Sequence, residues 1–432
     1  MARLAALTFA LVLAWLLGQA AQADSAFQIT ALATGVALVA ATLAGSLIER
    51  IGLPRVTGYL LFGLVCGPYI ANIVTRPMAR ELSVFNGLAV TLIAFVAGLE
   101  VNLRRLAPRL RAVTTLAAVT LAALYVGLFA AFWTAWPWLG IAPELSGLQR
   151  LAAVALLTTL VASFSPTVTI ALVAESRSSG PLTELTLALV ILADLALIFV
   201  FTLVMELVRQ AFGGAAEVGL LAGVTWEIGG SLALGGVAGS ILALYLRYVG
   251  RELALVVIAF CAAIAGAAAV LHLEPLVAAL AGGLVVENLT PRSGDELKEA
   301  VERGALPVLV IFFAAAGASL QLDALAAMGW AAAGAALLRL VLIKTGVRAA
   351  CRLAAIDDEP SRLVWMGLIS QAGVTLGLAM IVAKEHPGWG GAMQTFVLAL
   401  IALHQLAGPV LFKAALERAG EIGRAALARG PT

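Results

Sequence analysis

The strongest constraint on this chain is a series of apolar runs of about 20 residues that recurs, between short polar stretches, along nearly all of its 432 residues. One such run matches the hydrocarbon thickness that a single α-helix must cross. Hydrophobic residues make up 62% of the chain and charged residues only 12%, which is more apolar than a soluble core requires. Only helices and closed barrels satisfy their backbone inside a bilayer, and the length of the runs predicts an all-α polytopic membrane protein rather than a barrel.

The N-terminus has the pattern of a secretory signal. Arg3 precedes an apolar run, and the small residues "AQA" at 21–23 resemble a cleavage site. We therefore predict a signal peptide at residues 1–23, the alternative being an uncleaved first span. A transmembrane domain would then occupy residues 24–416 and a short cytoplasmic tail residues 417–432, which would leave no room for a cytosolic regulatory domain.

Hydropathy and polar flanks divide the rest of the chain into thirteen apolar segments. They cover approximately residues 27–48, 57–73, 82–99, 113–133, 151–174, 182–207, 226–249, 253–271, 275–286, 306–320, 324–347, 363–382 and 392–412. With the N-terminus outside, twenty of the 27 Lys and Arg residues lie at cytoplasmic ends and five in outer loops. This bias follows the positive-inside rule. We therefore predict about 13 transmembrane helices in the inner (plasma) membrane, with the C-terminus in the cytoplasm.

Two ionisable residues lie deep inside apolar segments, where a charge is costly and usually functional. Asp194 has nine uncharged residues between it and Glu184 and eleven between it and Glu206, which places a carboxylate near the middle of the sixth segment. We interpret Asp194 as a proton or cation site, because an isolated carboxylate is an expensive way to hold helices together. Arg339, in the eleventh segment, must find an acceptor inside the protein. A structural role, bonding carbonyls or carboxylates of a neighbouring helix, and a role in transport both remain open.

The fifth segment is interrupted near its middle by a proline among hydroxyl side chains. Ser163, Ser165 and Thr167 surround Pro166. Proline removes a backbone donor and disfavours helical geometry at the residue before it. An unwound backbone is tolerated at this depth only where it lines a cavity or is buried in protein. The alternative is a proline kink in a continuous helix.

A second interruption, with Ser370, Gln371 and Gly373, lies in the twelfth segment. It comes seven segments after the first, and this odd offset gives the two helices opposite orientations. Two discontinuous helices in opposite orientation, at corresponding places in two halves, indicate an inverted-repeat transporter with its ion site at the midplane. The facing helix ends carry opposite partial charges, and Asp194 supplies a carboxylate for a small cation or a proton.

Five stretches of the chain are similar, as a set and in their order, to the motifs of one known family. They are "VTGYLLFGLVCGP" (56–68), "FVAGLEVNL" (95–103), "FFAAAGASLQLDAL" (312–325), "LISQAGVTLGLA" (368–379) and "HQLAGPVLFKAALERAGE" (404–421). Together they resemble the cation/proton antiporter superfamily, in its sodium- or potassium-proton exchanger branch. The five in this order are fairly specific as a set and extend over nearly the whole chain after the predicted signal.

The resemblance implies a transporter rather than an enzyme, with thirteen spans divided between a dimerisation domain and a mobile core domain that moves like an elevator. It implies that the fifth and twelfth spans cross as broken helices and that Asp194 is the ion-binding aspartate. Ser163, Ser165, Thr167 and nearby backbone would help coordinate the cation, and Arg339 takes the place of an embedded Lys or Arg. The expected partners are Na+ or K+, H+, the lipid bilayer and a second copy of the chain in a homodimer; no cofactor and no nucleic acid are expected.

One position departs from the family pattern. Relatives often carry Asp, Asn or Gln immediately before the essential aspartate, and this chain has Ala193 there. A salt bridge from Arg339 to that position is therefore impossible. A single titratable carboxylate is most simply interpreted as exchanging one proton for one cation, which would be electroneutral.

Other hypotheses remain open at this stage. A cation channel could use the same polar path, and a sodium-coupled organic-anion symporter could use the crossed helices for sodium. An intramembrane aspartyl protease would need two facing carboxylates, and a serine–histidine site would have to recruit His272 or His404. A lone His in a span is more often packed or hydrogen-bonded between helices. The three cysteines have no paired spacing, so neither a disulfide framework nor a metal site is suggested.

Overall fold

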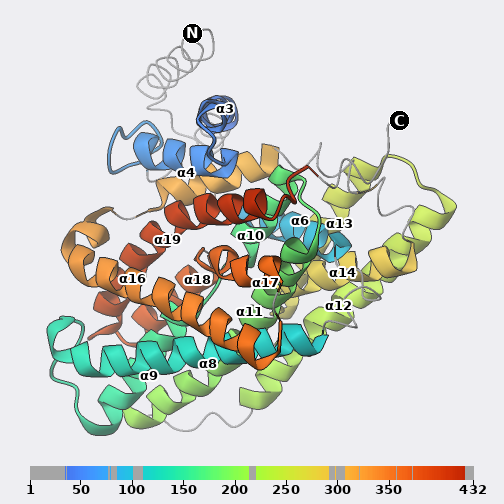
Figure 1. Cartoon of the computed structure of the whole chain (residues 1–432). Helices are drawn as coiled ribbons and strands as arrows, with labels where there is room; N and C mark the ends of the chain where they lie inside the picture. Colours follow the sequence, from blue (N-terminus) through green and yellow to red (C-terminus); the bar gives the residue numbers. More distant parts are fainter. Residues whose placement is uncertain are drawn as a thin grey trace. The chain divides into compact units, whose positions relative to one another are not determined.

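The computed structural model describes most of the chain after its N-terminal region (Figure 1). The described residues are 35, 37–75, 78, 85–100, 110–213, 220–290, 297, 307–320, 322–356, 358–371 and 373–423. The predicted signal peptide, residues 1–23, lies outside them. Throughout the described ranges the regular structure is helical and no strand occurs, which confirms the all-α prediction.

The chain folds into two compact units that alternate along the sequence. Unit 1 comprises Met1–Leu103, Ile170–Glu175 and Trp226–Leu320, and unit 2 comprises Arg104–Thr169, Ser176–Thr225 and Gln321–Thr432. Every residue that the sequence analysis assigned to the ion site belongs to unit 2.

Unit 1 is built on close contacts between helix backbones. Its helices are η1 (Ala37–Ala41), α3 (Thr42–Arg50), α4 (Arg55–Cys66), α6 (Phe85–Glu100), most of α12 (Leu220–Tyr248), α13 (Leu253–Leu271), α14 (Pro275–Leu289) and the helix Pro307–Ala318. A Cβ on Gly98 of α6 would lie 2.2 Å from the Leu280 carbonyl oxygen, and one on Gly283 of α14 would lie 2.1 Å from that of Phe95. Small residues allow this approach, which is how membrane helices associate without a hydrophobic driving force.

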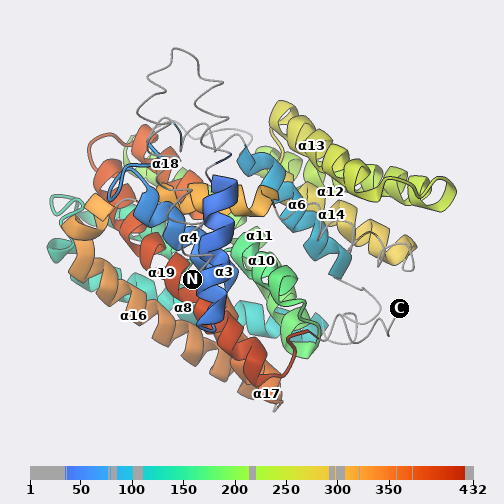
Figure 2. The ribbon, with the colours of Figure 1, turned by 90° about the horizontal axis from the view of Figure 1, so that it is seen from above.

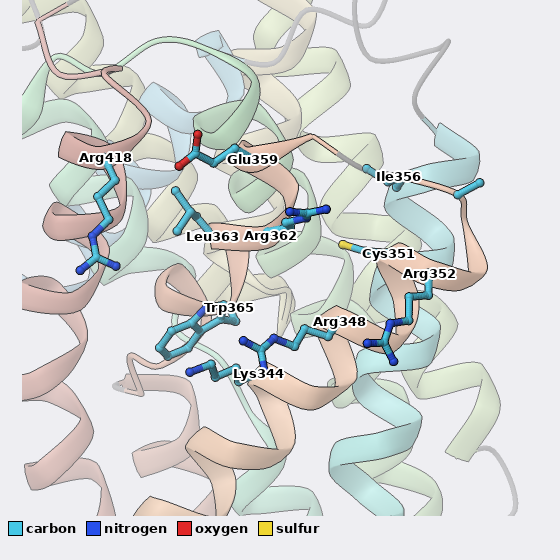
Figure 3. A pocket seen from close by; sticks show the side chains of 11 residues that line it. Lys344, Arg348, Cys351, Arg352, Ile356, Glu359, Arg362, Leu363, Trp365 and Arg418 are labelled. Carbon is cyan, nitrogen blue, oxygen red and sulfur yellow. The ribbon is translucent and has the colours of Figure 1, made fainter.

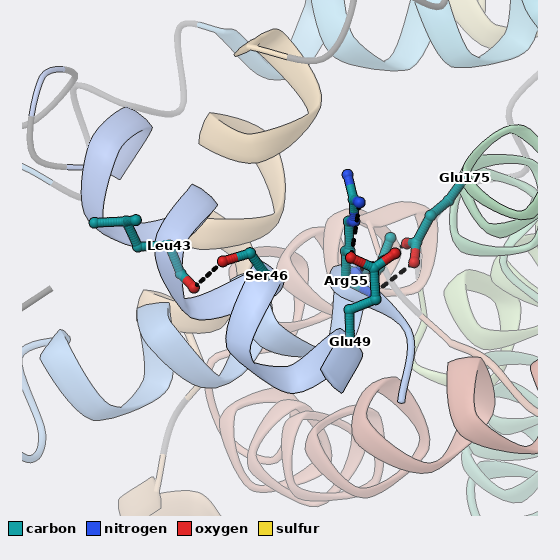
Figure 4. A network of polar contacts seen from close by, with 6 residues as sticks. Leu43, Ser46, Glu49, Arg55 and Glu175 are labelled. Atoms are coloured by element: carbon teal, nitrogen blue, oxygen red, sulfur yellow. Dashed lines mark hydrogen bonds and ion pairs between the residues drawn. The ribbon is translucent and has the colours of Figure 1, made fainter. Parts of the chain in front are cut away.

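A carboxylate caps the start of α4 within unit 1 (Figure 4). Glu175 accepts hydrogen bonds from the backbone N–H groups of Arg55 at 2.5 Å and Val56 at 3.0 Å. The Arg55 side chain pairs with Glu49 at 2.7 Å. These first N–H groups of a helix have no partner inside it, and a negative charge there also complements the positive end of the helix dipole.

Unit 2 contains two sets of helices with the same order: a long helix, an interrupted helix and a second long helix. The first set is α8 (Leu110–Ala135), which η3 (Trp136–Trp138) extends, then α9 (Gly147–Ala162) followed by α10 (Pro166–Ser176), and α11 (Pro181–Ala211). Residues Ile170–Glu175 of α10 are the part of this set that is assigned to unit 1. The second is α16 (Leu322–Leu353), then α17 (Glu359–Leu363) and η4 (Val364–Leu368) followed by α18 (Gly373–Glu385), and α19 (Gly390–Arg418). Within these sets α11 packs on α9, and α16 and α19 lie side by side (Figure 2). The repeated order agrees with the predicted inverted repeats.

All thirteen predicted segments overlap a helix, but the helices differ in length. Among the described residues, seven are long and apolar enough to cross a membrane: Leu110–Trp138, Gly147–Ser176, Pro181–Ala211, Thr225–Tyr248, Leu253–Leu271, Leu322–Leu353 and Gly390–Arg418. Four shorter apolar helices accompany them: Arg55–Cys66, Gly87–Leu99, Pro275–Leu289 and Pro307–Ala318. The protein is therefore a multi-pass membrane protein, and the number thirteen stays a prediction.

The segment after α19 is fastened to the beginning of α11. Glu421 is 1% exposed, and its carboxylate accepts from the backbone N–H groups of Leu182 and Thr183, both at 2.8 Å. It also accepts from the Thr183 hydroxyl at 2.7 Å. Gly180 allows this close approach, because a Cβ there would lie 2.5 Å from the Glu421 carboxyl carbon. The predicted tail, residues 417–432, thus includes the end of α19 and a buried cap on the helix that carries Asp194.

Replacing Glu421 by alanine is expected to destabilise unit 2. The change leaves two N–H groups of the first turn of α11 without the carboxylate, which should cost about 2–4 kcal/mol of folding free energy. The unfolding temperature in detergent measures the effect. Glu417→Ala, at an exposed position in the last turn of α19, is the control and should leave it unchanged. Equal unfolding temperatures for the two variants would contradict the capping role.

Candidate functional site

The first interrupted helix is unwound rather than kinked. Helix α9 ends at Ala162 and α10 begins at Pro166, and Ser163 between them has extended backbone with φ −65° and ψ 151°. Pro166 suits the first position of α10 because that position needs no N–H donor. The Ser165 hydroxyl accepts from the N–H of Val168 at 3.5 Å, as a residue preceding a helix does. The predicted discontinuity at 163–165 is confirmed.

The second interrupted helix is unwound over residues 369–371, between the end of η4 at Leu368 and the start of α18 at Gly373. No proline lies in this stretch. Instead, Ser370 packs directly against Gly408 of α19, where a Cβ would lie 2.8 Å from the Ser370 Cα. The unwound backbone is therefore held by close packing against the last long helix. This second discontinuity is confirmed as well.

The two unwound segments meet each other. The Gln371 side-chain amide donates to the carbonyl oxygens of Val161 at 2.9 Å and Ser163 at 3.2 Å, and to the Ser163 hydroxyl at 3.1 Å. The Ser163 hydroxyl is also hydrogen-bonded to the Thr375 hydroxyl in the first turn of α18. On the other side of the amide, the Gln371 oxygen lies 2.8 Å from Nδ1 of His404 in α19. One side chain thus links three helices across the crossing.

Arg339 lies on α16 with no exposed surface and holds both segments at once. Its guanidinium donates to the carbonyls of Val161 at 2.9 Å and Ser163 at 2.5 Å. It also donates to those of Ile369 at 2.8 Å and Leu368 at 3.3 Å. Each C-terminal helix end carries roughly half a negative charge, so two such ends offset about one guanidinium charge. Among the described residues the partners of Arg339 are backbone carbonyls, with the Phe164 ring 5.4 Å from the guanidinium carbon.

Asp194 is 3% exposed near the middle of α11, 13 residues after Pro181 and 17 before Ala211. At about 1.5 Å per residue it stands roughly 20 Å from one end of the helix and 26 Å from the other. Helix α11 packs against α9 and η4, the two half-helices whose ends Arg339 binds. Ala193 beside it is 1% exposed, so no second polar group precedes the aspartate.

The predicted coordinating hydroxyls are all buried, but they have different partners. Ser163 belongs to the network of Gln371 and Thr375, whereas Ser165 and Thr167 are hydrogen-bonded to each other at 3.0 Å. Sequence reasoning placed Thr375 in the second interrupted segment but did not pair it with Ser163, and it did not place His404 in this network. His404 was expected to be a packed or interhelical hydrogen-bonding residue, and it is one, but nothing in the sequence identified Gln371 as its partner.

Comparison with known proteins agrees with this architecture. The family profile described as "Sodium/hydrogen exchanger, transmembrane" matches residues 35–416. Among curated proteins, none matches the chain in sequence. A structure of the sodium proton antiporter MjNhaP1 from Methanocaldococcus jannaschii at pH 8 aligns with a TM-score of 0.65 and 16% identity, covering 93% of this chain and 99% of that one. An electron-microscopy structure of the same antiporter aligns with a TM-score of 0.70 and 16% identity, covering 90% and 97%.

At 16% identity the structural likeness shows a shared fold, whereas the profile match covers most of the chain. With two interrupted helices that meet at a buried arginine, and a carboxylate at the middle of the neighbouring helix, the chain belongs to the sodium/hydrogen exchanger family and is a transporter, not an enzyme.

Proposed function

We propose that this protein exchanges a monovalent cation, Na+ or K+, for a proton across the plasma membrane by alternating access, with Asp194 as the site that both ions share. Membership of the sodium/hydrogen exchanger family supports cation/proton antiport. The observation that carries the site assignment is the pair of unwound segments joined by Arg339 and Gln371, in the unit that also holds the buried Asp194. Unwound helices offer carbonyl and hydroxyl oxygens at mid-membrane, where coupling ions bind in transporters of this kind.

The mechanism is competition for one carboxylate. Asp194 carries either a proton or a cation, and either load neutralises it, whereas a bare carboxylate would be costly to move through the membrane. Ser165 and Thr167 are hydrogen-bonded to each other, and hydroxyl oxygens have further lone pairs with which to accept a cation. Arg339, whose donors bind carbonyls, positions the two segments and does not compete with the cation.

In this proposal unit 2 is the moving core and unit 1 forms the homodimer, with the N-terminus outside and the C-terminus in the cytoplasm. The interleaving of the two units in the sequence supports this division, because each unit is drawn from both halves of the chain. One titratable carboxylate then couples one proton to one cation, so each cycle is electroneutral.

The direct test is ion exchange by the purified protein in proteoliposomes. With an internal pH dye and a proton gradient imposed, addition of Na+, K+ or Li+ in turn should dissipate the gradient, with a preference among the three. Liposomes without protein are the control. An imposed membrane potential should not change the rate. Absence of exchange with all three cations would refute antiport. An ion conductance far above the turnover rate of a carrier would show that the protein is a channel. A current coupled to exchange would refute the electroneutral stoichiometry.

A further inference from the structure

Unit 2 contains a cavity of about 1040 Å³ with basic side chains that the transport mechanism does not use (Figure 3). Its walls come from the last turns of α16, from α17 and η4, and from the end of α19. The lining includes one acidic residue, Glu359, and five basic ones: Lys344, Arg348, Arg352, Arg362 and Arg418. Five positive charges less one negative charge leave a net +4 on the lining.

No ion pair in the described part of the chain accounts for the basic residues of α16. Lys344, Arg348 and Arg352 recur every four residues, so they lie on one face of the helix and repel one another. In the described part of the chain, none of these three residues lies within ion-pair distance of a carboxylate. The positive-inside bias accounts for basic residues at a cytoplasmic helix end, but not for their convergence with Arg418 of another helix on one cavity.

An aromatic ring completes the cavity. Trp365 of η4 is half-buried, and the Lys344 ammonium lies 5.0 Å from the centre of its ring. In the view of Figure 3, Trp365 and Leu363 lie between Arg418 on one side and the α16 side chains on the other. The cavity therefore offers positive charge on two sides of an apolar wall, which suits a ligand with both an anionic and an apolar part.

We propose that this cavity binds a phosphate-bearing anion. Phosphate oxygens accept paired hydrogen bonds from the planar guanidinium groups of Arg348, Arg352 and Arg418, and Lys344 adds a point charge. Basic pockets between membrane helices bind the phosphate headgroups of anionic lipids in this way. A phosphorylated solute has the same chemistry, and its non-phosphate part would rest on Trp365.

A ligand in this cavity would touch the helices that hold the ion site. Arg339 lies five residues before Lys344 on α16, and the Leu368 carbonyl that Arg339 binds lies three residues after Trp365. Bound phosphate would thus stabilise α16 and η4 in the arrangement that joins the unwound segments. Binding itself does not depend on the proposed exchange activity and is tested separately from it.

The test measures thermal stabilisation of the full chain in neutral detergent at about 0.15 M salt, where weak surface attraction is screened. The probes are cardiolipin, ATP and pyrophosphate, with phosphatidylcholine as the neutral lipid. We expect at least one phosphate probe to raise the unfolding temperature in a saturable way, and phosphatidylcholine not to do so. Saturation by cardiolipin alone identifies a lipid headgroup as the source, and saturation by ATP or pyrophosphate identifies a soluble phosphate.

The decisive comparison is between two matched pairs of arginines. Arg348→Gln with Arg352→Gln should weaken binding at least about tenfold, since each lost charge-assisted contact is worth about that factor. Arg247→Gln with Arg251→Gln, an exposed pair with the same spacing on unit 1, should leave binding unchanged. If the first pair fails to fold, Arg418→Gln alone should weaken binding. The proposal would be overturned if both double variants bound the phosphate probe with equal affinity, or if no phosphate probe bound the protein in a saturable way.

Discussion

Replacing Asp194 by asparagine is expected to reduce cation/proton exchange to the background rate while the protein stays folded. The amide has nearly the same shape, but it neither binds and releases a proton nor supplies the negative charge that holds a cation. Because burial of a charge opposes folding, the neutral variant should be at least as stable as the parent protein. Loss of activity with unchanged or raised stability is the signature of a residue kept for function.

The measurement combines the proteoliposome assay with the unfolding temperature in detergent. Asp323→Asn is the matched control: the same substitution at an exposed position in the first turn of α16 should leave exchange unchanged and should lower stability by at most about 1 kcal/mol, the contribution of one exposed charge to the helix dipole. Asp194→Glu retains the carboxylate and should retain measurable exchange. Substantial exchange by the asparagine variant would refute Asp194 as the shared site, and a large drop in its unfolding temperature would indicate a structural role instead.

The two interruptions differ in how strongly the sequence predicts them. Pro166 favours a break by its own chemistry, because it lacks an N–H group and disfavours helical geometry at Ser165, although Pro409 lies inside the continuous helix α19. The break at 369–371 contains no such residue, and polar side chains together with Gly373 in an apolar segment were the signs of it. The structure shows that this break is packed against Gly408, which lies 38 residues later in the chain and lets α19 approach the Ser370 backbone. A contact of this kind depends on tertiary packing and is not encoded locally.

The sequence predicted which type of group a buried polar side chain would bond to, but not which residues would supply that group. A buried arginine must bond to something, and backbone carbonyls were one of two predicted partners for Arg339. Which carbonyls they are depends on where two half-helices end, one of them more than 170 residues away in the chain. Local periodicity places a side chain on a helix face, but it does not say which helix that face meets.

Glu421 is another residue whose long-range partner could not be predicted from the local sequence, and it lies in a region that was interpreted only as a tail. Helix α19 ends at Arg418, and nothing nearby in the sequence suggests that Glu421 caps a helix 238 residues earlier. Glu175 is a second case, since it caps α4 from 120 residues away. Both are acidic residues shortly after a helix or in its last turn, where the helix dipole does not favour negative charge. That local mismatch is the signal that could have identified them.

Replacing Arg339 by methionine is the second change with a large expected effect. Methionine replaces the unbranched aliphatic part of the side chain but is shorter and donates no hydrogen bonds, so the carbonyls of Leu368 and Ile369 lose the guanidinium. Burying two acceptors without it should cost about 2–6 kcal/mol, at roughly 1–3 kcal/mol each. A typical protein has only about 5–15 kcal/mol of stability in total. We therefore expect a much lower unfolding temperature and little or no exchange, with Arg247→Met as the exposed control.

In the Arg339→Met variant the end of α9 should stay better ordered than the end of η4, because Gln371 also donates hydrogen bonds to the carbonyls of Val161 and Ser163. Hydrogen exchange in the Arg339→Met variant should therefore rise more at residues 369–371 than at 163–165. Gln371→Leu leaves the Val161 and Ser163 carbonyls bound to Arg339, and its main loss is the hydrogen bond with His404. It should therefore cost less than Arg339→Met, whereas the double variant removes both donors. The double variant should lose more stability than the sum of the single ones, because the two side chains share acceptors. Strict additivity would mean that the two donors do not replace each other, and the role assigned to Arg339 at the crossing would then be wrong.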